Sequence, residues 1–212
     1  SAKQLGYVEQ DESLDLDGID AAHKLVILAY LCFHQWFSLK DIHVEGIRNV
    51  TLADIDAASR QGYRIRLIAT LREQEDHEQV ECSVRPSLVP LSNNLASVSD
   101  VYNGVCIQGD IVGTSFLIGR GAGREPTSSA VLSDIVDYCQ HEREQKLING
   151  EKRYRLASPA NVRHSYYMRF DVADLKGVLS EITEILSTNE ISISTIEQHL
   201  NREGESASIM LT

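Results

Sequence analysis

A nearly continuous apolar run from Leu25 to Phe33 is the feature that most constrains how this 212-residue chain can fold. An acidic stretch precedes it, because residues 9–20 contain six carboxylates. The pattern predicts a helix from about Ile19 to Trp36, with Asp17 as its N-cap because a short carboxylate there can accept from the first backbone N–H groups. Apolar residues fall on every face of this helix, so we expect it to be buried. With nine residues, the run is too short to cross a membrane.

Asp20 and Lys24 lie one turn apart at the start of this helix, which leaves two interpretations open. The first is an ordinary i,i+4 ion pair, which contributes about 0.2–0.5 kcal/mol on a surface. The second is a polar pocket with one amine among several carboxylates, suited to holding an α-amino acid and moving a proton. A calcium loop starting at Asp15 is excluded, because its turn glycine would stand at the fourth position instead of the sixth. We expect no metal site.

The middle of the chain predicts a sheet with helical cover. Thr51 and Asp54 have the spacing of a capping box for a short helix over 51–61. Alternating residues predict a short strand at 42–47 and an antiparallel pair at 64–71 and 80–89, with one face of the sheet exposed to water. Residues 105–108 and 112–118 predict a further hairpin. We therefore expect an α+β fold, with a mixed, mostly antiparallel sheet backed by the helices at 19–36 and 51–61.

A glycine-rich loop, in which Gly121 and Gly123 stand out, joins the last of these strands to a helix at about 127–145. Such a loop either makes a tight turn or presents backbone N–H groups to an anion. It is not a complete dinucleotide fingerprint, because position 124 holds Arg where glycine is required.

The C-terminal part follows a charged linker at 150–159. A strand at 166–172, a helix at 178–187 and strands at 191–198 and 206–211 give a β-α-β-β order. This order resembles a partial ACT domain, a small ferredoxin-like regulatory fold, over residues 163–212.

Charge and cysteine content narrow the class of protein. The net charge of −11 and the lack of a basic cluster argue against nucleic-acid and membrane-surface binding. The four scattered cysteines form no Cys-x-x-Cys and are expected to be reduced thiols in the core of a cytoplasmic protein.

Two segments resemble homoserine dehydrogenases, and the likeness extends over nearly the whole chain. The substrate-site signature of that family is similar to the spacing of Gly6, Tyr7, Glu9, Asp11, Asp15, Gly18, Asp20 and Lys24. The segment from Gly119 to Asp134 is similar to the family's second glycine-rich motif. The resemblance implies an oxidoreductase that interconverts L-homoserine and L-aspartate 4-semialdehyde with NADP or NAD, in threonine, methionine and isoleucine biosynthesis. It also implies a catalytic and dimerisation domain at 1–150.

The resemblance implies roles for individual residues. Lys24 and Asp20 would be catalytic, with Lys24 as the acid–base group, and Gly121 and Gly123 would contact the cofactor. Substrate would be bound by Tyr7, Glu9, Asp15 and Asp20.

The resemblance further implies that a nucleotide-binding domain lies upstream of residue 1 and packs on residues 119–147. We accordingly expect residues 1–212 alone to be folded and dimeric, or part of a higher homo-oligomer, but inactive. An amino-acid effector, threonine by family expectation, is a further implied partner. The competing hypothesis is a non-catalytic amino-acid-binding regulatory protein with a dimerisation scaffold.

Overall fold

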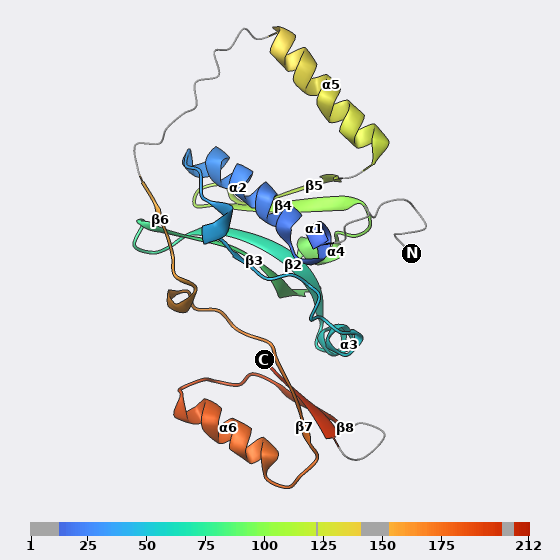
Figure 1. Cartoon of the computed structure of the whole chain (residues 1–212), viewed down its shortest axis with the longest axis vertical. Helices are drawn as coiled ribbons and strands as arrows, with labels where there is room; N and C mark the ends of the chain where they lie inside the picture. The colour runs from blue at the N-terminus through green and yellow to red at the C-terminus, as the bar shows by residue number, and fades with distance from the viewer. Residues whose placement is uncertain (1–12, 122, 141–152, 201–205) are drawn as a thin grey trace.

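A computed structural model describes residues 13–121, 123–140, 153–200 and 206–212 (Figure 1). Tyr7 and Glu9 lie outside the described residues. The helical elements are α1 (Ser13–Leu16), α2 (Ile19–Phe33), η2 (Leu39–Asp41), α3 (Leu52–Arg60), α4 (Asn94–Ser97), α5 (Arg124–Gln140), η3 (Pro159–Asn161) and α6 (Val178–Thr188). The strands are β1 (His43–Val44), β2 (Tyr63–Glu73), β3 (Gln79–Pro90), β4 (Tyr102–Gly109), β5 (Gly113–Arg120), β6 (Arg155–Leu156), β7 (Met168–Ala173), β8 (Ile196–Leu200) and β9 (Ser206–Leu211).

The main sheet is built on the long hairpin of β2 and β3, which confirms the predicted antiparallel pair. The two strands pair from Tyr63 with Pro90 to Glu73 with Val80. Asp76 closes the turn between them, because its Oδ1 accepts from the backbone N–H groups of Glu78 and Gln79 at 2.9 Å. The short strands β1 and β6 run parallel to β3 and make the sheet mixed.

Helix α2 covers one face of this sheet, so the predicted helix is confirmed but its burial is one-sided. Ala22, Leu25 and Ala29 are buried in clusters with β3 residues of the same face. Ile27 and Leu31 point away from the sheet, and they are 52% and 62% exposed. The expectation of a helix buried on all sides was wrong, because the sheet contacts a single face.

The start of α2 also differs from the prediction. Its N-cap is Gly18, with φ +79° and no side-chain cap, and not Asp17. Gly18 packs so closely that an added Cβ would lie 3.3 Å from both Val44 and Val84. The left-handed turn at Gly18 leaves the Asp17 carboxylate outside the helix, where it pairs with Arg48.

The capping box of α3 is present as predicted, with Thr51 Oγ1 accepting from Asp54 N and the Asp54 carboxylate accepting from Thr51 N. The second hairpin, β4 with β5, is also confirmed, but it forms a separate two-stranded sheet. From the end of β5 the chain passes into α5, which stands clear of the main sheet in Figure 1 and has no buried residue.

The C-terminal unit has the predicted β-α-β-β order and an antiparallel sheet in the order β7-β9-β8. Leu186 of α6 packs with Ile209 and Leu211 of β9 in its core. Strand β8 begins at Ile196, five residues later than predicted. Before it, the backbone N–H groups of Ser194 and Thr195 donate to the carbonyl of Thr212 instead of joining a ladder.

Of the four cysteines, Cys82 alone is buried, and all four are free thiols. The expectation of core thiols was therefore wrong for Cys32, Cys106 and Cys139. Within the described ranges, no helix has the length and apolar character to cross a membrane.

Candidate functional site

Asp20 and Lys24 form an ion pair on the first two turns of α2. Lys24 Nζ lies 2.6 Å from Asp20 Oδ2, and the two side chains are 53% and 50% exposed. This is the geometry of an ordinary i,i+4 pair. The second interpretation, a polar pocket, also involves Tyr7 and Glu9, which lie outside the described residues, and it stays a prediction. The ion pair holds the Lys24 amine near the N-terminal end of α2, where it is accessible to solvent.

Asp15 lies on the short helix α1, which packs against the beginning of α2. The structure therefore brings Asp15, Asp20 and Lys24 to the same end of α2. All three side chains are reachable from solvent. This arrangement can offer carboxylate oxygens and one ammonium to a small polar ligand.

A contact that the sequence did not reveal holds in place the acidic segment from Asp15 to Asp20, which leads into α2. Arg48 pairs with Asp17 through two nitrogens, and its Nη2 lies 3.2 Å from Asp17 Oδ2. Beside it, Ile47 N donates to Leu16 O at 2.8 Å. A Cβ at Gly46 would collide with the backbone at Leu16 and Asp17. Glycine at position 46 was the available signal, because it marks a close approach of two backbones.

The glycine loop is shaped first by packing. Gly121 N donates to Val101 O at 2.8 Å, and a Cβ at Gly121 would collide with the Asn103 side chain. Gly123 has φ +117°, which favours glycine. Both glycines are thus explained by a tight strand-to-helix turn, and a cofactor role for them is a separate hypothesis.

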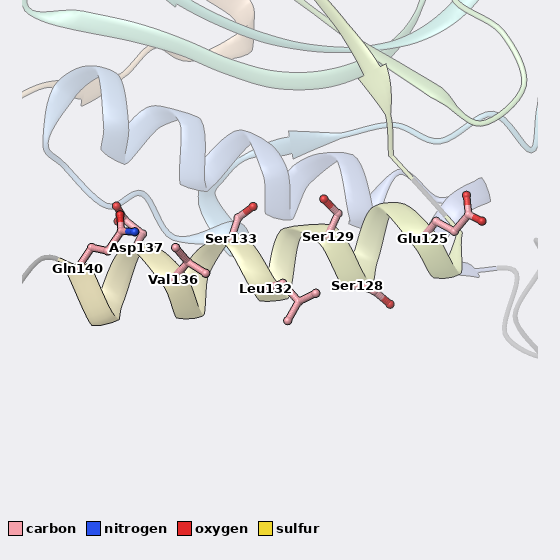
Figure 2. A pocket seen from close by; sticks show the side chains of 8 residues that line it. All are labelled: Glu125, Ser128, Ser129, Leu132, Ser133, Val136, Asp137 and Gln140. Atoms are coloured by element: carbon pink, nitrogen blue, oxygen red, sulfur yellow. The ribbon is translucent and has the colours of Figure 1, made fainter.

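Helix α5 carries a shallow pocket along its length, but all of the lining comes from this one helix (Figure 2). Ser129 and Ser133 project from one side of the helix, whereas Ser128 and Leu132 project from the other. A surface with a single wall cannot enclose a ligand. Four apolar residues of this helix are exposed, namely Val131, Leu132, Ile135 and Val136.

A larger cavity of about 1090 Å³ lies on the opposite face of the main sheet, and sequence reasoning missed it. Glu81 and Ser83 of β3 line it, and each is only 4% exposed. The expectation of a water-exposed sheet face was wrong here, because the segment containing His164 covers it. His164 Nε2 lies 3.0 Å from Glu81 Oε1. The two residues are too distant in sequence for a local pattern to pair them.

Asp54 fastens the C-terminal unit to the first part of the chain. Its carboxylate accepts from Tyr167 Oη at 2.7 Å and from Arg169 Nη1 at 2.5 Å, in addition to the capping contacts with Thr51. Burial opposes ionisation of Asp54, but these hydrogen bonds and the charge of Arg169 together hold its pKa below the ordinary value. Burial and the contact with Asp54 raise the pKa of Tyr167.

A second polar contact strengthens this junction. Arg60 Nε lies 2.6 Å from Glu197 Oε1, and His199 Nε2 lies 2.7 Å from the same oxygen. The hydrogen bond from Arg60 lowers the pKa of Glu197, and hydrogen bonds from His199 and Gln61 add to this effect. Within the part of the chain that the structure describes, no three His, Cys, Asp or Glu residues gather as a metal site.

Comparisons with known proteins show the family to which the chain belongs. The family model described as homoserine dehydrogenase matches residues 1–136. The homoserine dehydrogenase of Corynebacterium glutamicum is 35% identical over 217 residues, which covers 100% of this chain and 48% of that protein.

Solved structures give the same result. The crystal structure of a homoserine dehydrogenase from Thiobacillus denitrificans superposes with a TM-score of 0.86 at 36% identity, over 99% of this chain and 49% of that one. A hyperthermophilic archaeal homoserine dehydrogenase in complex with NADPH has a TM-score of 0.52 at 31% identity, over 66% of this chain and 38% of that one.

This chain spans about half the length of the curated relatives that it matches. The match includes the residues from α1 through most of α5, a range that contains Asp15, Asp20, Lys24 and the glycine loop. The chain belongs to the homoserine dehydrogenase family.

Proposed function

We propose that this chain is the catalytic part of a homoserine dehydrogenase, which interconverts L-homoserine and L-aspartate 4-semialdehyde with NADP or NAD. The observation that carries the proposal is the 2.6 Å ion pair of Lys24 with Asp20, inside the segment that the family model matches. It places a charged amine in the first two turns of α2, directly after the short helix α1 that carries Asp15. The product homoserine serves threonine, methionine and isoleucine biosynthesis.

In this proposal Lys24 handles the proton. When bound, the nicotinamide supplies the hydride chemistry. Lys24 Nζ donates a proton to the aldehyde oxygen during reduction and takes it from the hydroxyl during oxidation. Asp20 orients the amine, because it holds Nζ through the ion pair.

The remaining acidic residues hold the substrate. Its ammonium group needs carboxylate partners, and we assign this role to Asp15, Asp20 and Glu9, with Tyr7 adding a hydroxyl. The contact of Arg48 with Asp17 keeps α1 and the start of α2 in position. Lys24 and Asp20 are catalytic in this scheme, and the other groups bind.

The cofactor contact is proposed at the turn before α5. We assign this contact to Gly121 and Gly123 because they stand in the family's second glycine-rich motif. Only the Pro126 ring lies within 4 Å of an added Cβ at Gly123, whose φ is positive, whereas Asn103 occupies the space beside Gly121. The NADPH-bound archaeal relative supports NADP as the cofactor. The exposed apolar residues of α5 support packing of residues 119–147 on a nucleotide-binding part.

We also propose that residues 1–150 form the catalytic and dimerisation domain and that residues 163–212 form an ACT-like regulatory domain. The sheet order β7-β9-β8 with α6 on one face fits a ferredoxin-like arrangement. Such a domain would bind an amino-acid effector, with threonine as the first candidate. A homodimer or a higher homo-oligomer in the cytoplasm completes the proposal.

A non-catalytic regulatory protein is the weaker hypothesis, because its relatives would not be expected to carry the homoserine dehydrogenase match across residues 1–136. The test is an assay of a protein of full family length with L-homoserine and either nicotinamide cofactor. We expect reduction of the cofactor with L-homoserine and none with D-homoserine. Equal rates with both enantiomers, or no turnover with either cofactor, would refute the proposal.

A further inference from the structure

We propose that the cavity on the second face of the main sheet is a binding site for a small zwitterionic α-amino acid, separate from the substrate site near Lys24. Strand β3 divides the two. Its residues Val80, Cys82 and Val84 face α2, whereas Glu81, Ser83 and Arg85 alternate with them and line the cavity. At about 1090 Å³, the cavity is slightly larger than the usual range of about 300–1,000 Å³ for small-molecule pockets.

Glu81 supplies the first half of the argument. It is 4% exposed, and its Oε1 accepts from Ser83 Oγ at 3.0 Å. Its Oε2 is buried and has no hydrogen-bond partner among the described residues. His164 lies within ion-pair distance of Oε1, but the angle is not that of a hydrogen bond, and Oε2 is left open. A buried carboxylate oxygen without a partner is costly, and a ligand ammonium group would satisfy it.

Arg85 supplies the second half. It lies on the same strand face, and its Nε is buried without a hydrogen-bond partner in the described part of the chain. Guanidinium groups bind carboxylates with two parallel hydrogen bonds. Four residues of strand separate the Cα atoms of Glu81 and Arg85 by about 13 Å. The two side chains and one small amino acid between them can fill this span.

Hydroxyl groups lie between these two charges. Ser83 stands midway between Glu81 and Arg85, and Thr70 of β2 is its directly opposite cross-strand partner. Along β3 the wall therefore presents a carboxylate, then a hydroxyl, then a guanidinium, while the exposed Arg72 of β2 stands opposite Glu81. A simple anion would leave Glu81 unsatisfied, and a simple amine would leave Arg85 unsatisfied. A zwitterion satisfies both.

The other wall of the cavity belongs to the C-terminal part of the chain, so a bound ligand would contact both parts. It is formed by C-terminal residues, among them His164, Tyr166 and Thr195. A ligand that bridges the two walls adds to the polar contacts of Asp54 with Arg169 and of Arg60 with Glu197. Binding would therefore stabilise the attachment of the β-α-β-β unit to the main sheet, which gives the site a regulatory character.

The test is calorimetric titration of the purified protein with a panel of L-amino acids other than homoserine. We expect at least one to bind, and its N-acetyl and carboxamide derivatives to fail, since each lacks one charge. The Kd should rise at least about tenfold in Glu81→Gln and in Arg85→Gln. Glu75→Gln and Arg153→Gln, which alter exposed residues, serve as matched controls and should leave the Kd unchanged.

Folding of the variants is checked by thermal unfolding without ligand. Because Glu81→Gln removes a buried charge with an open oxygen, it should not lower the Tm. No binding by any amino acid at millimolar concentration would overturn the proposal, as would equal Kd values in wild type and both variants. Another contradicting result would be variants that differ from the wild type in molecular mass, measured by light scattering, but not in Kd. That result would assign this face to a second copy of the chain and would also overturn the proposal. The homoserine assay is independent of each of these outcomes.

Discussion

The two faces of strand β3 are both buried, but one is apolar and the other is polar. On one face, Val80, Cys82 and Val84 pack against α2 and form an apolar core. On the other face, Glu81 and Ser83 are just as buried, yet they are polar and border a cavity. Burial alone therefore does not mark a core. An apolar face needs only to be filled by packing, whereas each polar group on a buried face also requires a hydrogen-bond partner.

The ion pair on α2 completes the comparison. Asp20 and Lys24 satisfy each other while half exposed, whereas Glu81 is covered and incompletely paired. An exposed ion pair of this kind adds little to the stability of the fold. The catalytic role that we propose for these two residues therefore does not compete with a structural role. The buried carboxylate of Glu81 instead has one oxygen without a hydrogen-bond partner among the described residues, and in our proposal a ligand supplies that partner.

The largest expected effect breaks the apolar face. Leu25 is 1% exposed at the centre of the α2 contact, so Leu25→Ala should lower the free energy of unfolding by about 2–5 kcal/mol. Leu31 is on the same helix but points away from the sheet, and Leu31→Ala should change it by less than about 0.5 kcal/mol. Urea unfolding of the two variants measures the difference. Equal losses would mean that both faces of α2 are covered.

The next prediction concerns chemistry on the α2 side. Lys24→Ala in a protein of full family length should lower kcat at least about 100-fold, because the proton at the aldehyde oxygen loses its carrier. The KM for the cofactor should change little. Steady-state kinetics with homoserine measures both values, and Lys40→Ala, at an exposed lysine of η2, is the control. A Lys24→Ala enzyme with more than half the wild-type kcat would remove Lys24 from the mechanism.

A third prediction tests the polar junction beside the cavity. Asp54→Asn removes the charge that Thr51, Tyr167 and Arg169 contact, and it should cost about 1–3 kcal/mol of stability at pH 7. The folded-state pKa of Asp54 lies below the ordinary value of 3.8 for an aspartate side chain. Its stabilisation is therefore fully present above that value and is lost as the pH falls through the folded pKa.

Urea unfolding at pH 7 and near pH 3 measures this change. The gap between wild type and Asp54→Asn should narrow at the lower pH, while Asp56→Asn, an exposed neighbour on α3, should show no such gap. A gap that stays constant across this range would show that the charge of Asp54 contributes nothing.

The smallest expected effect concerns the reactivity of the four cysteines. Burial, with a smaller contribution from Glu81, raises the pKa of Cys82 to about 11. At pH 8 about one thiol in a thousand would be ionised, so Cys82 should resist a thiol reagent in the folded protein. Cys32, Cys106 and Cys139 are exposed and should react. Rapid reaction of a fourth thiol without denaturant would mean that the α2 face opens.

Local patterns in the sequence predicted much of the fold. The Thr51–Asp54 capping box, the hairpin of β2 and β3, and the β-α-β-β order depend on residues a few positions apart. The burial of α2 was less predictable, because amino-acid type does not show which face a sheet will cover.

The contacts of the sites were harder to predict for the same reason. Asp17 pairs with Arg48, and Glu81 meets His164, across long separations that no periodicity encodes. The resemblance supplied Lys24, Asp20 and Asp15 as candidates, and the structure adds that they share one end of α2. It could not supply Glu81 or Arg85, because an alternating strand reads as one wet face until the covering segment is known.

The most direct test of two separate sites is titration of Lys24→Ala with the amino acid that binds the wild-type protein. Lys24 is on the α2 side of the sheet and Glu81 is on the cavity side. The account predicts that Lys24→Ala binds this amino acid with the wild-type Kd, while its turnover of homoserine is at least about 100-fold slower. A Kd raised in Lys24→Ala to the same extent as in Glu81→Gln would contradict the account, because the two faces would then serve a single site.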